Sequence, residues 1–156
     1  MIVIWVLSIA LVVGVVMLHF EGLTLINRFA LSRAAVERMH LMLVIVSLLL
    51  LHVLEICVFA FGIYIAHHLF HLGNFAGERE FVASDYFHFS AETFTTVGYG
   101  DLYPIGSLRV LASMESLTGV LLIAWSGAFS YFTVQRLWDA AAHEKAMRPA
   151  RRARKD

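Results

Sequence analysis

Residues 95–101 read Thr95-Thr96-Val97-Gly98-Tyr99-Gly100-Asp101. Gly98 and Gly100 can adopt backbone angles that are closed to residues with a side chain. With glycine at alternate positions, successive carbonyl groups can point the same way, toward one axis. Thr96 adds a hydroxyl oxygen at the inner end of this row. The stretch is therefore typical of a backbone segment that presents oxygens to a cation, and a simple glycine-rich turn is the weaker interpretation.

The sequence around this segment resembles a known family from residue 90 to residue 104, which read Ser-Ala-Glu-Thr-Phe-Thr-Thr-Val-Gly-Tyr-Gly-Asp-Leu-Tyr-Pro. It is similar to the pore loop of the small bacterial potassium channels, whose filter replaces the hydration shell of K⁺ with backbone carbonyls. The resemblance is specific at 90–104 and only architectural over about 40–137. It implies that the K⁺ ligands come from Thr96, Val97, Gly98, Tyr99 and Gly100, with the Thr96 hydroxyl innermost.

The composition is that of a membrane protein. Of the 156 residues, 60% are hydrophobic, and the mean hydropathy is +0.74. This is too apolar for a soluble domain, and the length allows one pore unit without a large soluble domain. Cys57 is the single cysteine, so no intrachain disulfide is expected. No nucleotide-binding, catalytic or metalloenzyme motif occurs, so neither an enzyme nor a nucleic-acid-binding protein is expected.

Three long apolar stretches predict three transmembrane helices. A cleaved signal peptide is the alternative for the first, but no positive charge precedes it and no small-residue cleavage pattern follows closely. Arginines among apolar residues at helical spacing then predict an amphipathic connector. The expected divisions are an N-terminal transmembrane helix over residues 1–20, the connector over 21–40, a pore domain over 41–138 and a basic tail over 139–156.

The pore domain is expected to hold an outer helix, a turret, a short pore helix, the filter and an inner helix, as in the family. The pore helix is predicted over residues 85–95, with Ser84 or Asp85 as its N-cap. The expected fold class is an all-α membrane protein of three transmembrane helices plus the pore helix and a re-entrant filter loop. One chain supplies one filter strand and the family closes the ring with four, so a homotetramer in membrane lipid is expected.

Charge predicts the orientation. The arginine excess in residues 21–40 and the basic tail place both segments in the cytoplasm by the positive-inside rule. The N-terminus and the turret then lie outside. The resemblance favours a multi-pass protein of the cell membrane, namely the bacterial inner membrane.

Three residues near the filter are expected to support it. In the family, the positions of Glu92 and Asp101 form a carboxyl–carboxylate pair behind the filter, and two close buried carboxyls share a proton. A family relative has Trp where this chain has His88 and Phe89. We therefore expect His88 to replace the indole that hydrogen-bonds the aspartate; a solvated histidine is the alternative.

The inner helix carries candidates for gating. Gly119 falls close to the family's hinge glycine, although glycine is also common where membrane helices pack closely. A second set shares one helix face and is predicted to line the cavity and inner mouth; some of this face could instead pack on the outer helix. These residues are Val120, Ile123, Gly127, Ala128 and Tyr131.

Several ionisable residues lie at apparent membrane depth, where such groups usually face a partner or water. His52 and Glu55 are spaced to pair on one helix face, and Glu115 is a candidate third member; an ion pathway is the alternative. His67 and His71 are spaced i,i+4 and are expected to share a helix face. For these two, an interfacial histidine belt, a Zn²⁺ site with further ligands and a proton sensor all stay open.

The resulting functional prediction is a potassium-selective channel with passive flux. The alternatives are a weakly selective cation channel, a K⁺ transporter pore subunit, and a non-conducting membrane protein that uses the histidines. No span carries a regular arginine series, so no voltage sensor of the usual kind is predicted. The gating stimulus is left open between protons, lipid, the first span and an unidentified regulatory partner.

Overall fold

The computed structural model describes residues 1–31, 38–77 and 81–152, with side chains described for 1–28, 41–77, 81–136, 138 and 139. Within these ranges the elements are α1 (Ile2–Leu31), α2 (Arg38–His68), β1 (Gly73–Gly77), α3 (Asp85–Phe94), β2 (Leu102–Gly106) and α4 (Leu108–Arg152).

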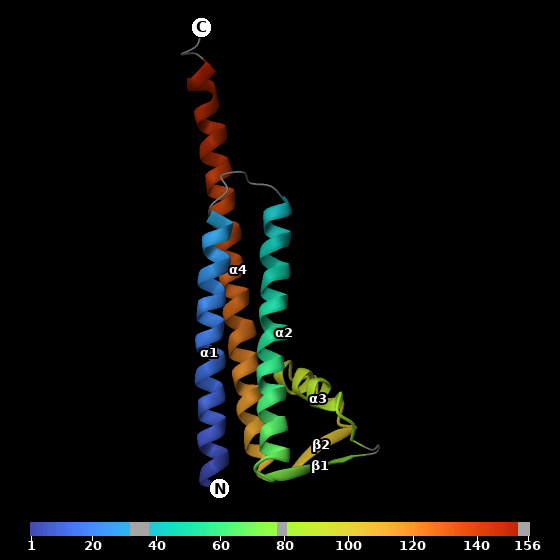
Figure 1. The fold of residues 1–156 in the computed structure, drawn as a ribbon. Helices are drawn as coiled ribbons and strands as arrows, with labels where there is room; N and C mark the ends of the chain where they lie inside the picture. Colours follow the sequence, from blue (N-terminus) through green and yellow to red (C-terminus); the bar gives the residue numbers. More distant parts are fainter. Residues whose placement is uncertain (32–37, 78–80, 153–156) are drawn as a thin grey trace.

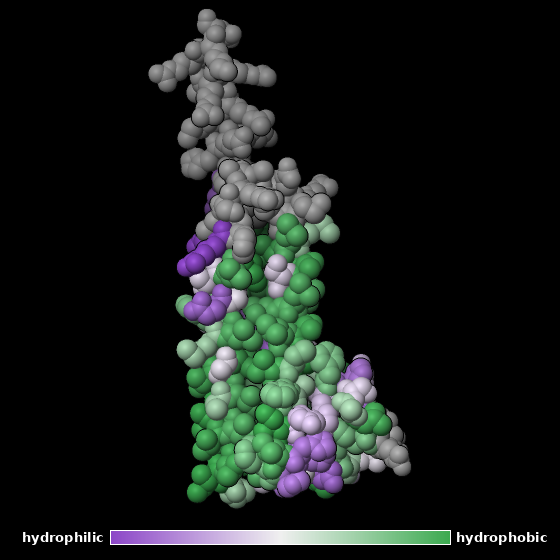
Figure 2. Space-filling model, viewed as in Figure 1, coloured by the Kyte–Doolittle hydropathy of each residue, from purple (hydrophilic) through white to green (hydrophobic). Residues whose placement is uncertain are grey.

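The helices α1, α2 and α4 run side by side as a bundle (Figure 1). Their apolar parts, Ile2–Arg28, Leu41–His68 and Leu108–Arg136, are each long enough to cross a bilayer. The expectation of three spans is therefore confirmed by length and composition. Hydrophobic side chains cover most of the visible face of the bundle, whereas hydrophilic ones gather toward its two ends (Figure 2). Such a band suits the lipid tails of a membrane.

A small layer made of α3, β1 and β2 lies at one end of the bundle (Figure 1). The two strands are antiparallel, with Gly73 opposite Gly106 and Gly77 opposite Leu102. The N-terminus lies at this same end, where the Ser107 hydroxyl is 3.9 Å from the sulfur of Met1. The C-terminus lies at the opposite end. The layer and the N-terminus therefore face one side of any membrane that the bundle crosses.

The described residues are mostly helical, as expected, and they add a small two-stranded sheet that the sequence does not predict. Residues 73–77 read Gly-Asn-Phe-Ala-Gly and carry no alternation of apolar and polar residues, so they give no strand signal. Residues 102–106 contain Pro104, which cannot donate a ladder hydrogen bond and argues against a strand. Next to the paired residues, the N–H of Ser107 donates to the carbonyl of Leu72 at 2.9 Å, which helps to hold the two segments together.

Two helices extend past the expected divisions. The helix α1 continues without a break through residue 20 and ends at Leu31, so much of the expected connector is helical. The helix α4 continues past the end of its apolar part to Arg152, through most of the expected tail. Residues 32–37, in the middle of the connector, lie outside the described residues, and the functional division of the chain stays a prediction.

The core joins all four helices around large buried side chains. Phe59 of α2 and Phe94 of α3 are both fully buried, with ring centroids 6.3 Å apart. Leu111 of α4 and Val15 of α1 are fully buried in the same cluster. Burial of a large apolar side chain contributes about 1.5–3 kcal/mol. This packing fixes the C-terminal end of α3, where the 95–101 segment begins.

Candidate functional site

The helix α3 leads into the 95–101 segment. Ser84, one of the two expected residues, occupies its N-cap position but makes no side-chain cap bond. Asp85 instead accepts a hydrogen bond from the backbone N–H of Val82 at 2.7 Å. A carboxylate in the first turn also suits the positive end of the helix dipole. The observed helix, Asp85–Phe94, agrees with the predicted range of 85–95 to within one residue.

The helix ends at a threonine that holds the chain against the last turn. The Thr95 hydroxyl donates to the carbonyl of Ala91 at 2.7 Å, and its N–H donates to the same oxygen at 3.1 Å. The N–H of Thr96 then turns back to the carbonyl of Thr93 at 3.1 Å. These bonds satisfy backbone carbonyls that the end of a helix leaves without partners, and they direct the chain away from α3.

The backbone of the segment alternates in handedness. The φ angles of Thr96, Gly98 and Gly100 are +60°, +51° and +81°, whereas Val97 and Tyr99 have negative φ. Left-handed angles suit the glycines but cost about 1–2 kcal/mol at a residue with a side chain, such as Thr96. A chain that alternates in this way turns successive carbonyls to one side. The segment can therefore present a row of oxygens, as its sequence predicts.

Glu92 ties the segment to α3. Its carbonyl accepts the N–H of Gly98 at 3.4 Å, and its carboxylate accepts the N–H of Tyr99 at 3.3 Å. Glu92 and Asp101 are both half-buried, while the His88 ring is exposed. Glu92 therefore contacts the backbone of the segment through both its carbonyl and its carboxylate. The pairing of Glu92 with Asp101, and the part expected of His88, stay predictions.

The segment and one face of α4 are open on a single chain. The side chains of Val97 and Tyr99 are 57% and 78% exposed, and Tyr131 of α4 is 61% exposed. The other residues predicted to line a cavity share this property: Val120, Ile123, Gly127 and Ala128 are all exposed. One chain therefore leaves uncovered the groups that the sequence assigns to a pore.

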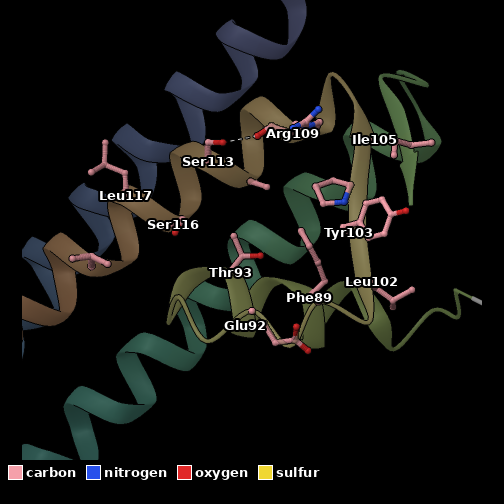
Figure 3. A pocket seen from close by; sticks show the side chains of 15 residues that line it. Phe89, Glu92, Thr93, Leu102, Tyr103, Ile105, Arg109, Ser113, Ser116 and Leu117 are labelled. Atoms are coloured by element: carbon pink, nitrogen blue, oxygen red, sulfur yellow. Dashed lines mark hydrogen bonds between the residues drawn. The ribbon is translucent and has the colours of Figure 1, made fainter. Parts of the chain in front are cut away.

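A groove of about 910 Å³ lies beside the segment. Figure 3 shows its wall, to which α3 contributes Phe89, Glu92 and Thr93, β2 contributes Leu102, Tyr103 and Ile105, and α4 contributes Arg109, Ser113, Ser116 and Leu117. Gly98, Gly100, Pro104, Ala112 and Val120 also line the groove. Its mixed walls, with apolar side chains beside hydroxyls and an arginine, have the character of a protein–protein contact surface.

Gly119 is the point where α4 meets the end of α3. A Cβ atom at this position would lie 2.0 Å from the carbonyl oxygen of Phe94 and 2.8 Å from its carbonyl carbon. Only a residue without a side chain permits this approach. Of the two interpretations of Gly119, this contact favours close packing.

A buried hydroxyl links three helices at the back of α3. The Ser90 Oγ lies 2.9 Å from the carbonyl oxygen of Ile56 and 2.5 Å from Oε1 of Glu115. A serine has one hydroxyl hydrogen, which can point to one of these oxygens or be shared between them. A proton on Glu115 would let its carboxyl donate to Ser90 while Ser90 donates to the carbonyl of Ile56. A protonated Glu115 also avoids a bare charge at membrane depth.

The predicted pair of His52 and Glu55 is confirmed, with Nδ1 of His52 at 2.8 Å from Oε2 of Glu55. The expectation that Glu115 joins this pair is wrong. Glu115 bonds to Ser90 instead, and His19 of α1 approaches Oε1 of Glu55 at 2.7 Å. Nothing in the sequence relates residue 19 to residue 55, and only its polarity within an apolar span marks it.

His67 and His71 do not share a helix face, because α2 ends at His68 and the φ of His71 is +49°. Nδ1 of His67 lies 2.5 Å from the hydroxyl oxygen of Tyr86. Burial, with a smaller effect of Tyr64, raises the pKa of the Tyr86 hydroxyl. That hydroxyl therefore stays protonated and can donate to His67. The histidines at this end belong to an aromatic cluster with α3.

Comparison with known proteins gives one match. The family model described as "Ion channel" matches residues 41–133, which is more than half of the chain. The matched region contains most of α2, the layer of α3 and the two strands, the 95–101 segment and most of the apolar part of α4. The helix α1 lies outside it. No curated protein and no solved structure matches the chain.

Proposed function

The chain belongs to the ion channel family and is a multi-pass membrane protein of ion transport, and from this premise we propose that it forms a potassium-selective channel. The observation that carries the proposal is the alternating backbone of Thr96, Gly98 and Gly100 directly after α3. A row of carbonyls on one side of a strand can replace the water around a dehydrated K⁺ ion. Flux through such a filter is passive and needs no catalytic step.

The filter is built as follows in this proposal. The carbonyls of Thr96, Val97, Gly98 and Tyr99 are the K⁺ ligands, with the Thr96 hydroxyl innermost and Gly100 closing the outer end. The helix α3 ends directly before this row, so its negative C-terminal end lies near the inner site and favours a cation there. K⁺ is the transported substrate.

Four copies around one axis complete the site. Non-helical backbone at membrane depth is tolerated only where it is buried in protein or lines water. Residues 95–100 are exposed on the single chain, so further copies have to cover them. The groove of about 910 Å³ beside the segment gives a neighbouring copy a surface to fill. A closed ring of identical chains meets both needs.

The conduction path continues along α4 and sets the orientation. The exposed face with Val120, Ile123 and Tyr131 follows the filter toward the C-terminal end of the bundle, and we assign it to the cavity and inner mouth. The N-terminus lies at the filter end. Arg28 and Arg136 are the last residues of two apolar spans, at the end of the bundle opposite the N-terminus. By the positive-inside rule, the filter end faces outward in the cell membrane.

A flux assay tests the proposal. The purified chain is reconstituted into liposomes loaded with K⁺, and efflux is followed with a proton-sensitive dye and an added protonophore. We expect rapid K⁺ efflux, and native mass spectrometry in mild detergent should give four chains per particle. A Na⁺ flux equal to the K⁺ flux would refute potassium selectivity and favour a weakly selective cation channel. Conduction by a stable monomer or dimer would refute the four-chain filter.

A further inference from the structure

Two histidines and one glutamate meet inside the bundle, away from the filter. Oε1 of Glu55 lies 2.7 Å from Nδ1 of His19, and Oε2 lies 2.8 Å from Nδ1 of His52. The side chains of His19 and Glu55 are fully buried, and that of His52 is 15% exposed. We propose that His19, His52 and Glu55 form a binding site for a transition-metal dication such as Zn²⁺, held between α1 and α2.

The donor set fits such an ion. One ligand atom from each residue lies within 4.8 Å of the others. Two imidazoles and a carboxylate are a common ligand set for Zn²⁺ when the fourth position holds water. Zinc bonds of about 2.0–2.1 Å place tetrahedral ligand atoms about 3.3 Å apart. The separations of 2.7 and 2.8 Å are slightly shorter than this, so small side-chain movements open the site.

Burial gives a second reason for a ligand. With both histidines neutral, the cluster leaves one carboxylate charge at membrane depth, which is costly. Nε2 of His19 is also buried and has no hydrogen-bond partner among the described residues. A buried polar group left unsatisfied costs about 1–3 kcal/mol. A bound dication offsets this negative charge.

The surrounding rings hold the two imidazoles in place. The His19 ring stacks on His52 at a centroid distance of 5.6 Å and contacts Trp125 of α4 at 5.2 Å. The His52 ring contacts Phe94, the last residue of α3, at 5.9 Å. A bound metal would therefore fix α1 to α2 beside the C-terminal end of α3. The helix α1 lies outside the matched family region. This inference does not depend on K⁺ conduction.

Metal binding to the full chain tests the proposal directly. The protein is prepared without a polyhistidine tag, stripped with a chelator in detergent and titrated with Co²⁺ or Zn²⁺ alone. We expect about one ion per chain, cobalt absorption bands of a four-coordinate site, and a higher melting temperature with Zn²⁺, because a ligand of the folded state stabilises it. A chain that binds no stoichiometric ion at micromolar concentrations would overturn the site.

Matched variants locate the ion. His52→Gln and Glu55→Gln should each weaken binding by more than about 10-fold, since each removes a ligand or its orienting partner. The partial exposure of His52 makes His52→Gln the variant that best preserves folding. His71→Gln and Cys57→Ser, both at exposed positions, are the controls and should bind as the parent does. Unchanged binding in His52→Gln, or equal loss in His71→Gln, would place the metal elsewhere and refute the proposal.

Discussion

Replacing Gly119 with alanine should loosen the contact between α4 and the end of α3. The added methyl carbon would lie 2.0 Å from the carbonyl oxygen of Phe94, where ordinary contact begins at about 3.4 Å. The obstacle is backbone, so no side chain can rotate away, and the helices have to separate by more than about 1 Å. Overpacking of this kind costs about 1–3 kcal/mol. It exceeds the 0.5–1 kcal/mol that alanine gains over glycine in a helix.

Melting temperature in detergent, together with K⁺ flux in liposomes, measures the effect. For a chain of this size, each kcal/mol corresponds to about 2–4 °C. Gly119→Ala should melt several degrees below the parent and lose flux, because Phe94 directly precedes the proposed filter. Gly14→Ala is the matched control, since a methyl group there meets no atom within 4 Å. Its melting temperature should stay the same or rise. If Gly119→Ala melts with the parent and changes only open probability, Gly119 is a hinge and the packing argument is wrong.

Three further predictions concern the filter, its support and the orientation. Gly98→Ala forces a methyl-bearing residue to a φ of +51°, so K⁺ over Na⁺ preference should fall sharply; an unchanged flux ratio would refute the filter assignment. Glu115→Gln keeps a hydrogen-bond donor toward Ser90 and should retain flux and stability, whereas Glu115→Leu should lower the melting temperature. Equal behaviour of the two variants would argue against a protonated Glu115 that donates to Ser90. The orientation is tested with single cysteines in a Cys57→Ser background. A cysteine at Ala83 should react with an impermeant thiol reagent added outside, and a cysteine at Asp139 should react only with reagent added on the cytoplasmic side. The reverse pattern would overturn the orientation.

The backbone of the 95–101 segment could be anticipated from the sequence because its determinants are local. The glycines at alternate positions explain the alternating φ angles, and an acidic residue at the start of α3 explains where that helix begins. The pairing of His52 with Glu55 also depends only on helical spacing. Such features need no knowledge of other parts of the chain.

Features that depend on distant segments could not be predicted. The sheet pairs residues 73–77 with 102–106, and neither segment carries strand periodicity. His19 reaches Glu55 only because α1 packs against α2. His67 and His71 have a helical spacing, but the helix ends between them. In each case tertiary contacts, or a helix end that no local residue marks, decide the outcome.

The central claim is that residues 96–100 of four chains select K⁺, and reversal potential tests it most directly. The purified protein is placed in a planar bilayer with K⁺ on one side and an equal concentration of Na⁺ on the other. A K⁺-selective filter should move the reversal potential toward the K⁺ equilibrium potential, by about 59 mV for each tenfold preference. Currents that reverse near 0 mV would show that the pore does not distinguish the two ions and would contradict the account.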